Sequence, residues 1–317
     1  MDLFKLSNNG LSPIDHDAFS LEKDIQTLVE NNLKTLFDLE FVSTEFAIDA
    51  FRLDTLCFDD ETNSFVIVEY KKGSSYSVID QGYSYLSIML NNKADFILEF
   101  NEKQDRTLKR DEVDWSSSRV IFVSPAFNSF QKNSVNFKDV PFELWEIKKF
   151  KGGVIALERH QSSSKESISN ISGNAANSVI SQVSSEVKVL REEDHVAKLS
   201  DKGVEVWNTL RERLEELPDT IFYARKGYVG FKKDNSVVCF IHFLKNHLSI
   251  EVSRGNISPN SEKSKGFFTL DDPKNFASER HWTHKNGVTG HSYTIKVSSL
   301  DDLEYSMYLL KQKYEVL

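Results

Sequence analysis

A Ser- and Asn-rich stretch in the middle of the chain constrains its fold most strongly. From Gln161 to Ser185 apolar residues are few and scattered, which is typical of a flexible linker or a poorly packed connection. The length of 317 residues is enough for two domains, and 39% hydrophobic residues are enough to give each a core. We therefore predict an N-terminal domain over residues 1–160, a linker over 161–190 and a C-terminal domain over 191–317.

Helical and extended patterns alternate before this stretch. Apolar residues recur at helical spacing from Leu21 to Phe37, with Ser20 as a candidate N-cap, and a second helix is expected from Val78 to Leu90. Strands are expected at residues 50–58, 65–71, 95–100, 119–123 and 142–150. This order predicts an α/β or α+β layer fold.

The second half has the pattern of a small α+β domain. Val204 to Leu217 is amphipathic at helical spacing, and a closing helix is expected from Leu300 to Tyr314. Between them we expect a meander of strands over residues 221–231, 237–243 and 248–252, with a turn at 233–235.

Two neighbouring strands of the first half carry the chemistry. If Phe58 pairs with Phe65 across the turn 59–64, Asp54 lies directly opposite Glu69. Lys71 then points to the same face as Glu69, because strand side chains alternate. Opposed like charges destabilise a ladder, whereas a divalent cation between two carboxylates relieves their repulsion. The alternative is that these residues form ordinary Glu–Lys pairs on a solvated face of the sheet. Lys71, however, follows the apolar run 65–68, which is the pattern expected of a buried central strand that ends at a functional site.

At these residues the sequence resembles the PD-(D/E)xK nuclease superfamily, more narrowly its RecB-like and Mrr-like branches. The resemblance covers about residues 20–150 and rests on "FRLDTL", "VIVEYKKG" and "VIDQGYSYL". It implies a restriction-endonuclease-like mixed sheet flanked by helices, with Asp54 and Glu69 as ligands of Mg²⁺ or Mn²⁺ and Lys71 as the catalytic lysine. Leu53 stands where the family name has proline.

Three further residues are candidates for the same site. In this superfamily a glutamate of the first helix often completes the metal site, which implies that role for Glu22; the alternative is a first-turn acid that complements the helix dipole. Gln81 and Tyr85 lie one helical turn apart, and the resemblance places them beside the catalytic lysine or the phosphate. The alternative for both is ordinary packing. Glu30 is expected to be a solvated surface residue.

The C-terminal half resembles a domain family of unknown function that often accompanies such nuclease cores, in the stretches "RKGYVGFKK" and "IHFLKNHLSIEV" and in residues 280–314. Aromatic residues alternate there with the candidate substrate-binding residues Arg225, Lys226, Lys232 and Lys233. Such a pattern can stack bases and contact phosphates, or form a half-buried strand pair with a lysine-blunted edge. His281, His284 and His291 lack a cysteine or acidic partner at ligand spacing and are not expected to bind metal.

The charge of the chain is unevenly distributed between its halves. The formal net charge is −9, and residues 197–317 hold 18 Lys and Arg against 16 Asp and Glu, so the first 196 residues carry −11. The sequence predicts a metal-dependent endonuclease or exonuclease acting on nucleic acid, with DNA favoured over RNA and a homodimer as an option. The alternative is a non-catalytic nucleic-acid-binding or regulatory module. No signal peptide or membrane span is evident, and Cys57 and Cys239 suit buried thiols in a cytoplasmic protein.

Overall fold

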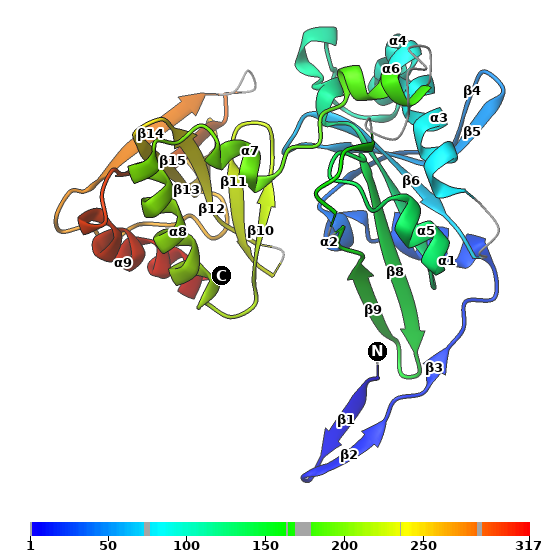
Figure 1. The fold of residues 1–317 in the computed structure, drawn as a ribbon, viewed down its shortest axis with the longest axis horizontal. Coiled ribbons are helices and arrows are strands. Elements are labelled where there is room, and N and C mark those ends of the chain that lie inside the picture. Colours follow the sequence, from blue (N-terminus) through cyan, green and yellow to red (C-terminus); the bar gives the residue numbers. More distant parts are fainter. Residues whose placement is uncertain (1, 73–76, 163, 169–178, 235, 284–286) are drawn as a thin grey trace. The chain divides into compact units, whose positions relative to one another are not determined.

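A computed structural model describes residues 2–72, 77–162, 164–168, 179–234, 236–283 and 287–317. The chain divides into two compact units, unit 1 from Met1 to Val189 and unit 2 from Leu190 to Leu317 (Figure 1). Each unit has hydrophobic core residues of its own. In the described part of the chain, no helix combines the length and the apolar character that a membrane span requires.

Unit 1 is built on a seven-stranded mixed sheet with strand order β3-β8-β7-β6-β5-β4, in which β9 also pairs with β8. The pairs β6–β7 and β7–β8 are parallel and the others are antiparallel. The strands are β3 (His16–Asp17), β4 (Glu40–Ile48), β5 (Phe51–Asp59), β6 (Ser64–Tyr70), β7 (Arg119–Ser124), β8 (Phe142–Phe150) and β9 (Val154–Arg159). The predicted mixed sheet flanked by helices is confirmed.

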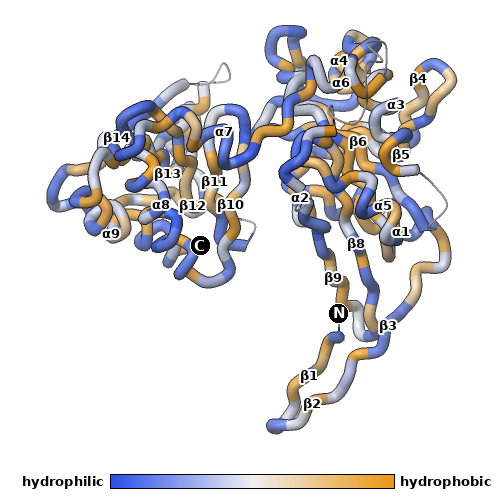
Figure 2. Tube along the Cα trace, in the orientation of Figure 1, coloured by the Kyte–Doolittle hydropathy of each residue, from blue (hydrophilic) through white to orange (hydrophobic). Residues whose placement is uncertain are grey.

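Helices cover both faces of this sheet. On one face Phe65 and Ile67 of β6 join a core with α3, α4 and α6, and on the other Val66 and Val68 pack with α1 and α2. The helices are α1 (Glu22–Glu30), α2 (Leu33–Phe37), α3 (Val78–Asn91), α4 (Lys93–Lys103), α5 (Ser129–Ser134) and α6 (Val179–Glu186). All residues of β6 are buried, and Figure 2 shows its hydrophobic colouring. Strands covered on both faces read as continuous apolar runs, which explains this sequence.

Two predicted elements of unit 1 needed correction. The segment 95–100, expected as a strand, lies within α4, because Phe96 and Phe100 are one helical turn apart and both face the core. The single helix expected from Leu21 is interrupted at Asn31, and Leu21, not Ser20, occupies the N-cap position of α1. The Asn32 side chain donates to the Leu28 carbonyl over 2.7 Å, a local bond that competes with helix continuation.

The Ser/Asn-rich stretch is not a linker over its whole length. Residues 163 and 169–178 lie outside the described residues, but α6 packs against α3, and Ile168, Val183 and Val187 are buried in the core of unit 1. The prediction of a flexible connection was therefore wrong for these residues. A few apolar side chains at helical spacing are enough to hold a polar segment on a core.

The N-terminal residues form a separate hairpin. Strands β1 (Phe4–Ser7) and β2 (Gly10–Pro13) pair only with each other among the described strands. Their large apolar side chains are exposed, including Leu6 and Leu11, which face each other across the pair.

Unit 2 is a six-stranded antiparallel sheet with order β10-β11-β12-β13-β15-β14 and helices α8 and α9 packed against it. The expected strand 221–231 is in fact two strands joined by a turn. The elements are α7 (Glu192–Val196), α8 (Asp201–Glu215), β10 (Thr220–Ala224), β11 (Val229–Lys233), β12 (Ser236–Leu244), β13 (His247–Ile257), β14 (Ala277–Thr283), β15 (Thr289–Val297) and α9 (Asp301–Glu315). The α+β class expected for this half is confirmed.

The two cysteines, Cys57 in unit 1 and Cys239 in unit 2, are both buried and free, and burial raises the pKa of each thiol.

Candidate active site

The register of the β5–β6 hairpin brings the two predicted carboxylates together. The ladder runs from Asp59↔Ser64 through Phe58↔Phe65 to Thr55↔Val68, which is the predicted register. Asp54 and Glu69 are the next residues along the two strands. Just beyond the ladder the Tyr70 backbone N–H donates to Asp54 Oδ2 over 3.0 Å, which holds the aspartate side chain toward β6.

Glu69 is the most confined member of the site. It is 3% exposed, and its Oε1 accepts from Lys71 Nζ over 2.6 Å and from Gln81 Nε2 over 2.7 Å. Its other oxygen, Oε2, is buried and has no hydrogen-bond partner. A buried carboxylate oxygen without a donor costs free energy unless a cation or water contacts it. Oε2 is therefore an oxygen that a cation could contact.

Asp54 shows the electrostatic consequence of this crowding. Burial raises its pKa to about 7 from the ordinary 3.8, and the negative charges of Glu69 and Glu22 act in the same direction. The Tyr70 N–H and the Lys71 ammonium oppose the rise without cancelling it. The pair has more negative charge than its surroundings neutralise, and a divalent cation would correct that imbalance.

Gln81 links the site to α3. Its Nε2 donates to Glu69 and, over 2.7 Å, to the Tyr85 hydroxyl, one turn further along the helix. Tyr85 is buried, and its burial raises the pKa of its phenol. Gln81 thus orients Glu69 so that Oε1 accepts both hydrogen bonds and Oε2 accepts none.

Glu22 lies at the start of α1, next to the end of β6. Its Oε2 accepts from the Lys72 backbone N–H over 2.9 Å, and Lys72 Nζ contacts the Ser20 carbonyl. No group of three or more His, Cys, Asp or Glu positioned to hold a metal occurs among the described residues. Glu22 is close enough to affect Asp54, yet the structure does not assemble it into a three-carboxylate site.

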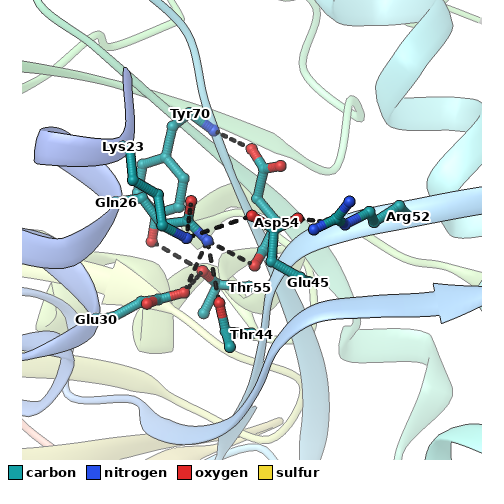
Figure 3. Close-up of polar contacts among 9 residues, drawn as sticks. All are labelled: Lys23, Gln26, Glu30, Thr44, Glu45, Arg52, Asp54, Thr55 and Tyr70. Atoms are coloured by element: carbon teal, nitrogen blue, oxygen red, sulfur yellow. Dashed lines mark hydrogen bonds and ion pairs between the residues drawn. The ribbon is translucent and has the colours of Figure 1, made fainter. Parts of the chain in front are cut away.

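A polar network that the sequence did not reveal supports Asp54 from behind (Figure 3). Gln26 Nε2 donates to the Asp54 carbonyl over 3.0 Å and also lies 3.0 Å from Glu30 Oε1. Thr55 Oγ1 donates to the same Glu30 oxygen over 2.7 Å, so the Tyr70 hydroxyl, 3.1 Å away, donates to Thr55.

Glu30 is therefore the common acceptor of this network, and its expected solvated position was wrong. A helical wheel places Glu30 off the apolar arc but does not show that a strand residue, Thr55, supplies a donor there. The sequence signal was the spacing Glu22, Gln26, Glu30, a polar stripe at four-residue intervals beside buried Ile25 and Val29.

The donor set fits a hard divalent cation. Asp54 and Glu69 offer carboxylate oxygens, the ligands that Mg²⁺ and Mn²⁺ prefer, and Mg²⁺ is commonly held by one or two carboxylates with water and substrate completing its shell. A bound cation of this kind supplies Lewis-acid stabilisation of charge on a phosphate. Lys71 adds a fixed positive charge at the same point, held in place by Glu69.

The predicted basic residues of unit 2 are not all in one place. Arg225 Cζ and Lys232 Nζ lie 5.0 and 4.5 Å from the centroid of the Tyr223 ring. Lys233 instead donates to the Tyr314 carbonyl of α9, and Lys226 is in the turn between β10 and β11. His281 and His291 stack at 5.9 Å, while His284 is outside the described residues.

Comparisons with known proteins agree with the division of the chain. Residues 192–316 match a domain family described as a domain of unknown function, DUF5655. A repair endonuclease from Pyrococcus abyssi and an EndoMS–dsDNA complex are similar at 16% and 17% identity, with TM-scores of 0.23 and 0.27. The matches cover 38% and 46% of this chain and 44% and 64% of those chains, and TM-scores of this size do not establish a shared fold.

One relative matches along almost the whole length. An "Uncharacterized protein" of Haemophilus influenzae is 42% identical over 318 residues, which cover 98% of this chain and 99% of the relative. The two proteins therefore share both units, and the chain belongs to the same family as this Haemophilus influenzae protein.

Proposed function

We propose that unit 1 is a divalent-cation-dependent nuclease that hydrolyses phosphodiester bonds of nucleic acid, with DNA as the expected substrate. The observation that carries the proposal is the buried, unpartnered Oε2 of Glu69 beside an aspartate whose pKa is raised to about 7. A folding-only arrangement gains nothing from two such carboxylates, whereas a cation site uses both.

Each residue has a distinct role in this proposal. Asp54 and Glu69 hold the cation, and Gln81 keeps Glu69 in its orientation through Oε1. Lys71 sits 2.6 Å from Glu69 and stabilises the negative charge that develops on the phosphate, or orients the attacking water. Tyr85 fixes Gln81. The tip of β6 thus presents positive and negative groups at one point, as phosphoryl chemistry requires.

The test separates cation binding from catalysis. Plasmid, linear duplex and single-stranded substrates are incubated with Mg²⁺ or Mn²⁺, and cation affinity is measured by calorimetry. Lys71→Ala should reduce cleavage by about a hundredfold to ten-thousandfold and keep cation binding, because Lys71 is not a ligand. Glu69→Ala should abolish both.

Matched controls are available nearby. Lys72→Ala removes the next lysine, and Asp80→Asn removes an exposed carboxylate of α3, so both should cleave like the wild type. A protein that neither binds the cation nor cleaves any of these substrates would instead be a non-catalytic module, an outcome consistent with its net charge of −9.

A further inference from the structure

Within the described residues of unit 2, helices cover one face of its sheet and leave the other face without a helix. Alternate strand residues that point toward α8 and α9 are buried; examples are Phe231, Ile241, Ile250 and Ile295. Their neighbours in sequence point to the opposite side. We call this second side the open face, and it comprises Tyr223, Lys232, Phe240, Glu251, Arg280 and Trp282 together with their neighbours on the same side.

Aromatic rings lie across the open face at both ends. The Tyr223 ring covers Gly230, where an added Cβ would lie 2.1 Å from the ring, and Trp282 covers Gly290 in the same way at 2.4 Å. Glycine at these two positions lets the rings approach the sheet closely. Trp282 remains 42% exposed, and Tyr228 packs edge-on against Phe240 at 4.8 Å.

Positive charge surrounds these rings. Arg225 and Lys232 both lie over Tyr223, and Arg280 and Lys296 are exposed on β14 and β15. The acidic residue among them, Glu251, lies 3.6 Å from His242 Nε2 and is outnumbered by the four basic side chains. The open face is therefore cationic, although the whole chain carries −9.

We propose that the open face binds single-stranded nucleic acid, with bases stacked on its aromatic rings and phosphates against its cations. Aromatic side chains on a sheet surface stack unpaired bases, and neighbouring cations follow the backbone. Polar residues between the rings, such as Ser249, Ser278 and Thr294, make a poor core for a protein interface, which is usually more apolar at its centre. The choice of nucleic acid as the partner rests on the proposed function of unit 1, but the binding itself does not require catalysis.

The test uses the full chain and a fluorescently labelled oligothymidine, with binding measured by anisotropy in EDTA so that no cleavage occurs. Trp282→Ala should weaken binding at least fivefold, the lower end of the contribution of one stacked base. Trp282→Phe, which keeps a ring over Gly290, should lose less. Arg280→Ala should reduce the slope of log affinity against log salt by about 0.7, the value of one phosphate contact on a single strand.

Two substitutions on the helix-covered side serve as matched controls. Tyr308 of α9 is 42% exposed, like Trp282, and Lys311 is an exposed cation of the same helix. Tyr308→Ala and Lys311→Ala should bind as the wild type does.

Three results would overturn the proposal. These are unchanged binding in the open-face variants, equal losses in the two controls, or competition by duplex DNA as strong as by single strands. In the first case the face serves a protein partner or no partner. Because these measurements exclude divalent cations, their failure is distinct from a failure to detect Mg²⁺-dependent cleavage.

Discussion

The two sheets of this protein use their surfaces in opposite ways. In unit 1 both faces are covered by helices, every residue of β6 is buried, and the proposed site lies at the point where β5 and β6 leave the ladder. In unit 2 the antiparallel sheet is covered on one face, and polar and aromatic side chains occupy the other. Sheets with parallel pairs need cover on both sides, whereas antiparallel sheets tolerate an uncovered one. A sheet covered on both faces thus leaves room for a small binding site only at its strand ends. A sheet covered on one face offers its other face as a broad binding surface.

The largest effect concerns where unit 1 ends. A chain of residues 1–160 lacks Ile168, Val183 and Val187, and burial of such side chains contributes roughly 5 kcal/mol in total. A chain of residues 1–189 keeps them. Chemical denaturation should therefore show 1–160 to be much less stable than 1–189. Equal stabilities would mean that α6 is not part of the core.

The second effect compares an alanine substitution at a helix-covered sheet face with one on the open face. A Cβ on Gly82 would lie 2.6 Å from the Phe142 ring, which is held between Tyr83 and Phe122. Alanine favours the helix by about 1 kcal/mol but overpacking costs more, so Gly82→Ala should destabilise unit 1 by a net of about 1–2 kcal/mol.

Gly230→Ala is the matched change on the open face. The added Cβ also meets a ring, Tyr223, but the groups that lie over this ring are the flexible side chains of Arg225 and Lys232, which can move with it. Stability should change by less than about 1 kcal/mol. Urea titration measures the stability of both variants. A larger loss of stability for Gly230→Ala than for Gly82→Ala would mean that the Tyr223 ring is packed as tightly as the core of unit 1.

The third effect is a dependence on pH that belongs to unit 1. Since the pKa of Asp54 is about 7 when folded and 3.8 ordinarily, between these values the folded state keeps a proton that the unfolded state loses. Stability without divalent cation should therefore fall as pH rises from about 4 to about 7. Asp54→Asn should remove this fall and be more stable than the wild type at pH 8, because the variant has no carboxylate to ionise in the folded state.

Denaturation in EDTA across this pH range tests whether stability falls as the pH rises. Mg²⁺ should restore stability to the wild type at pH 8 and have no such effect on Asp54→Asn. A wild-type stability that rises between pH 4 and 7 would contradict the raised pKa of Asp54.

The smallest effect concerns the network behind the site. Glu30→Gln keeps the shape of the side chain but removes the charge that Gln26 and Thr55 donate to, at a cost of about 0.5–1 kcal/mol. Cation affinity should fall slightly, because Gln26 also holds the Asp54 carbonyl. Glu45→Gln is the control, since Glu45 forms ion pairs with the exposed side chains of Lys23 and Arg52, both drawn in Figure 3.

The sequence was most informative where two strands share a short turn. The register of β5 and β6 followed from the apolar pattern and the turn, so the neighbouring positions of Asp54 and Glu69 could be predicted. Helix α4 could not, because a short apolar run fits a strand as well as a buried helix. Helix α6 has too few apolar residues to stand out, and one donor to Glu30, the Thr55 hydroxyl, comes from a strand 25 residues away. Such contacts depend on tertiary packing and leave no local signal.

The burial of β6 also determines which insertions and deletions this family can tolerate. An extra residue between Phe65 and Glu69 would reverse the faces of every later side chain in the strand, separating Glu69 and Lys71 from Asp54 or forcing apolar residues out of both cores. An extra residue in the turn between Asp59 and Ser64 changes neither ladder nor faces. Length variation among relatives is therefore expected to collect in that turn and to be absent from the strand.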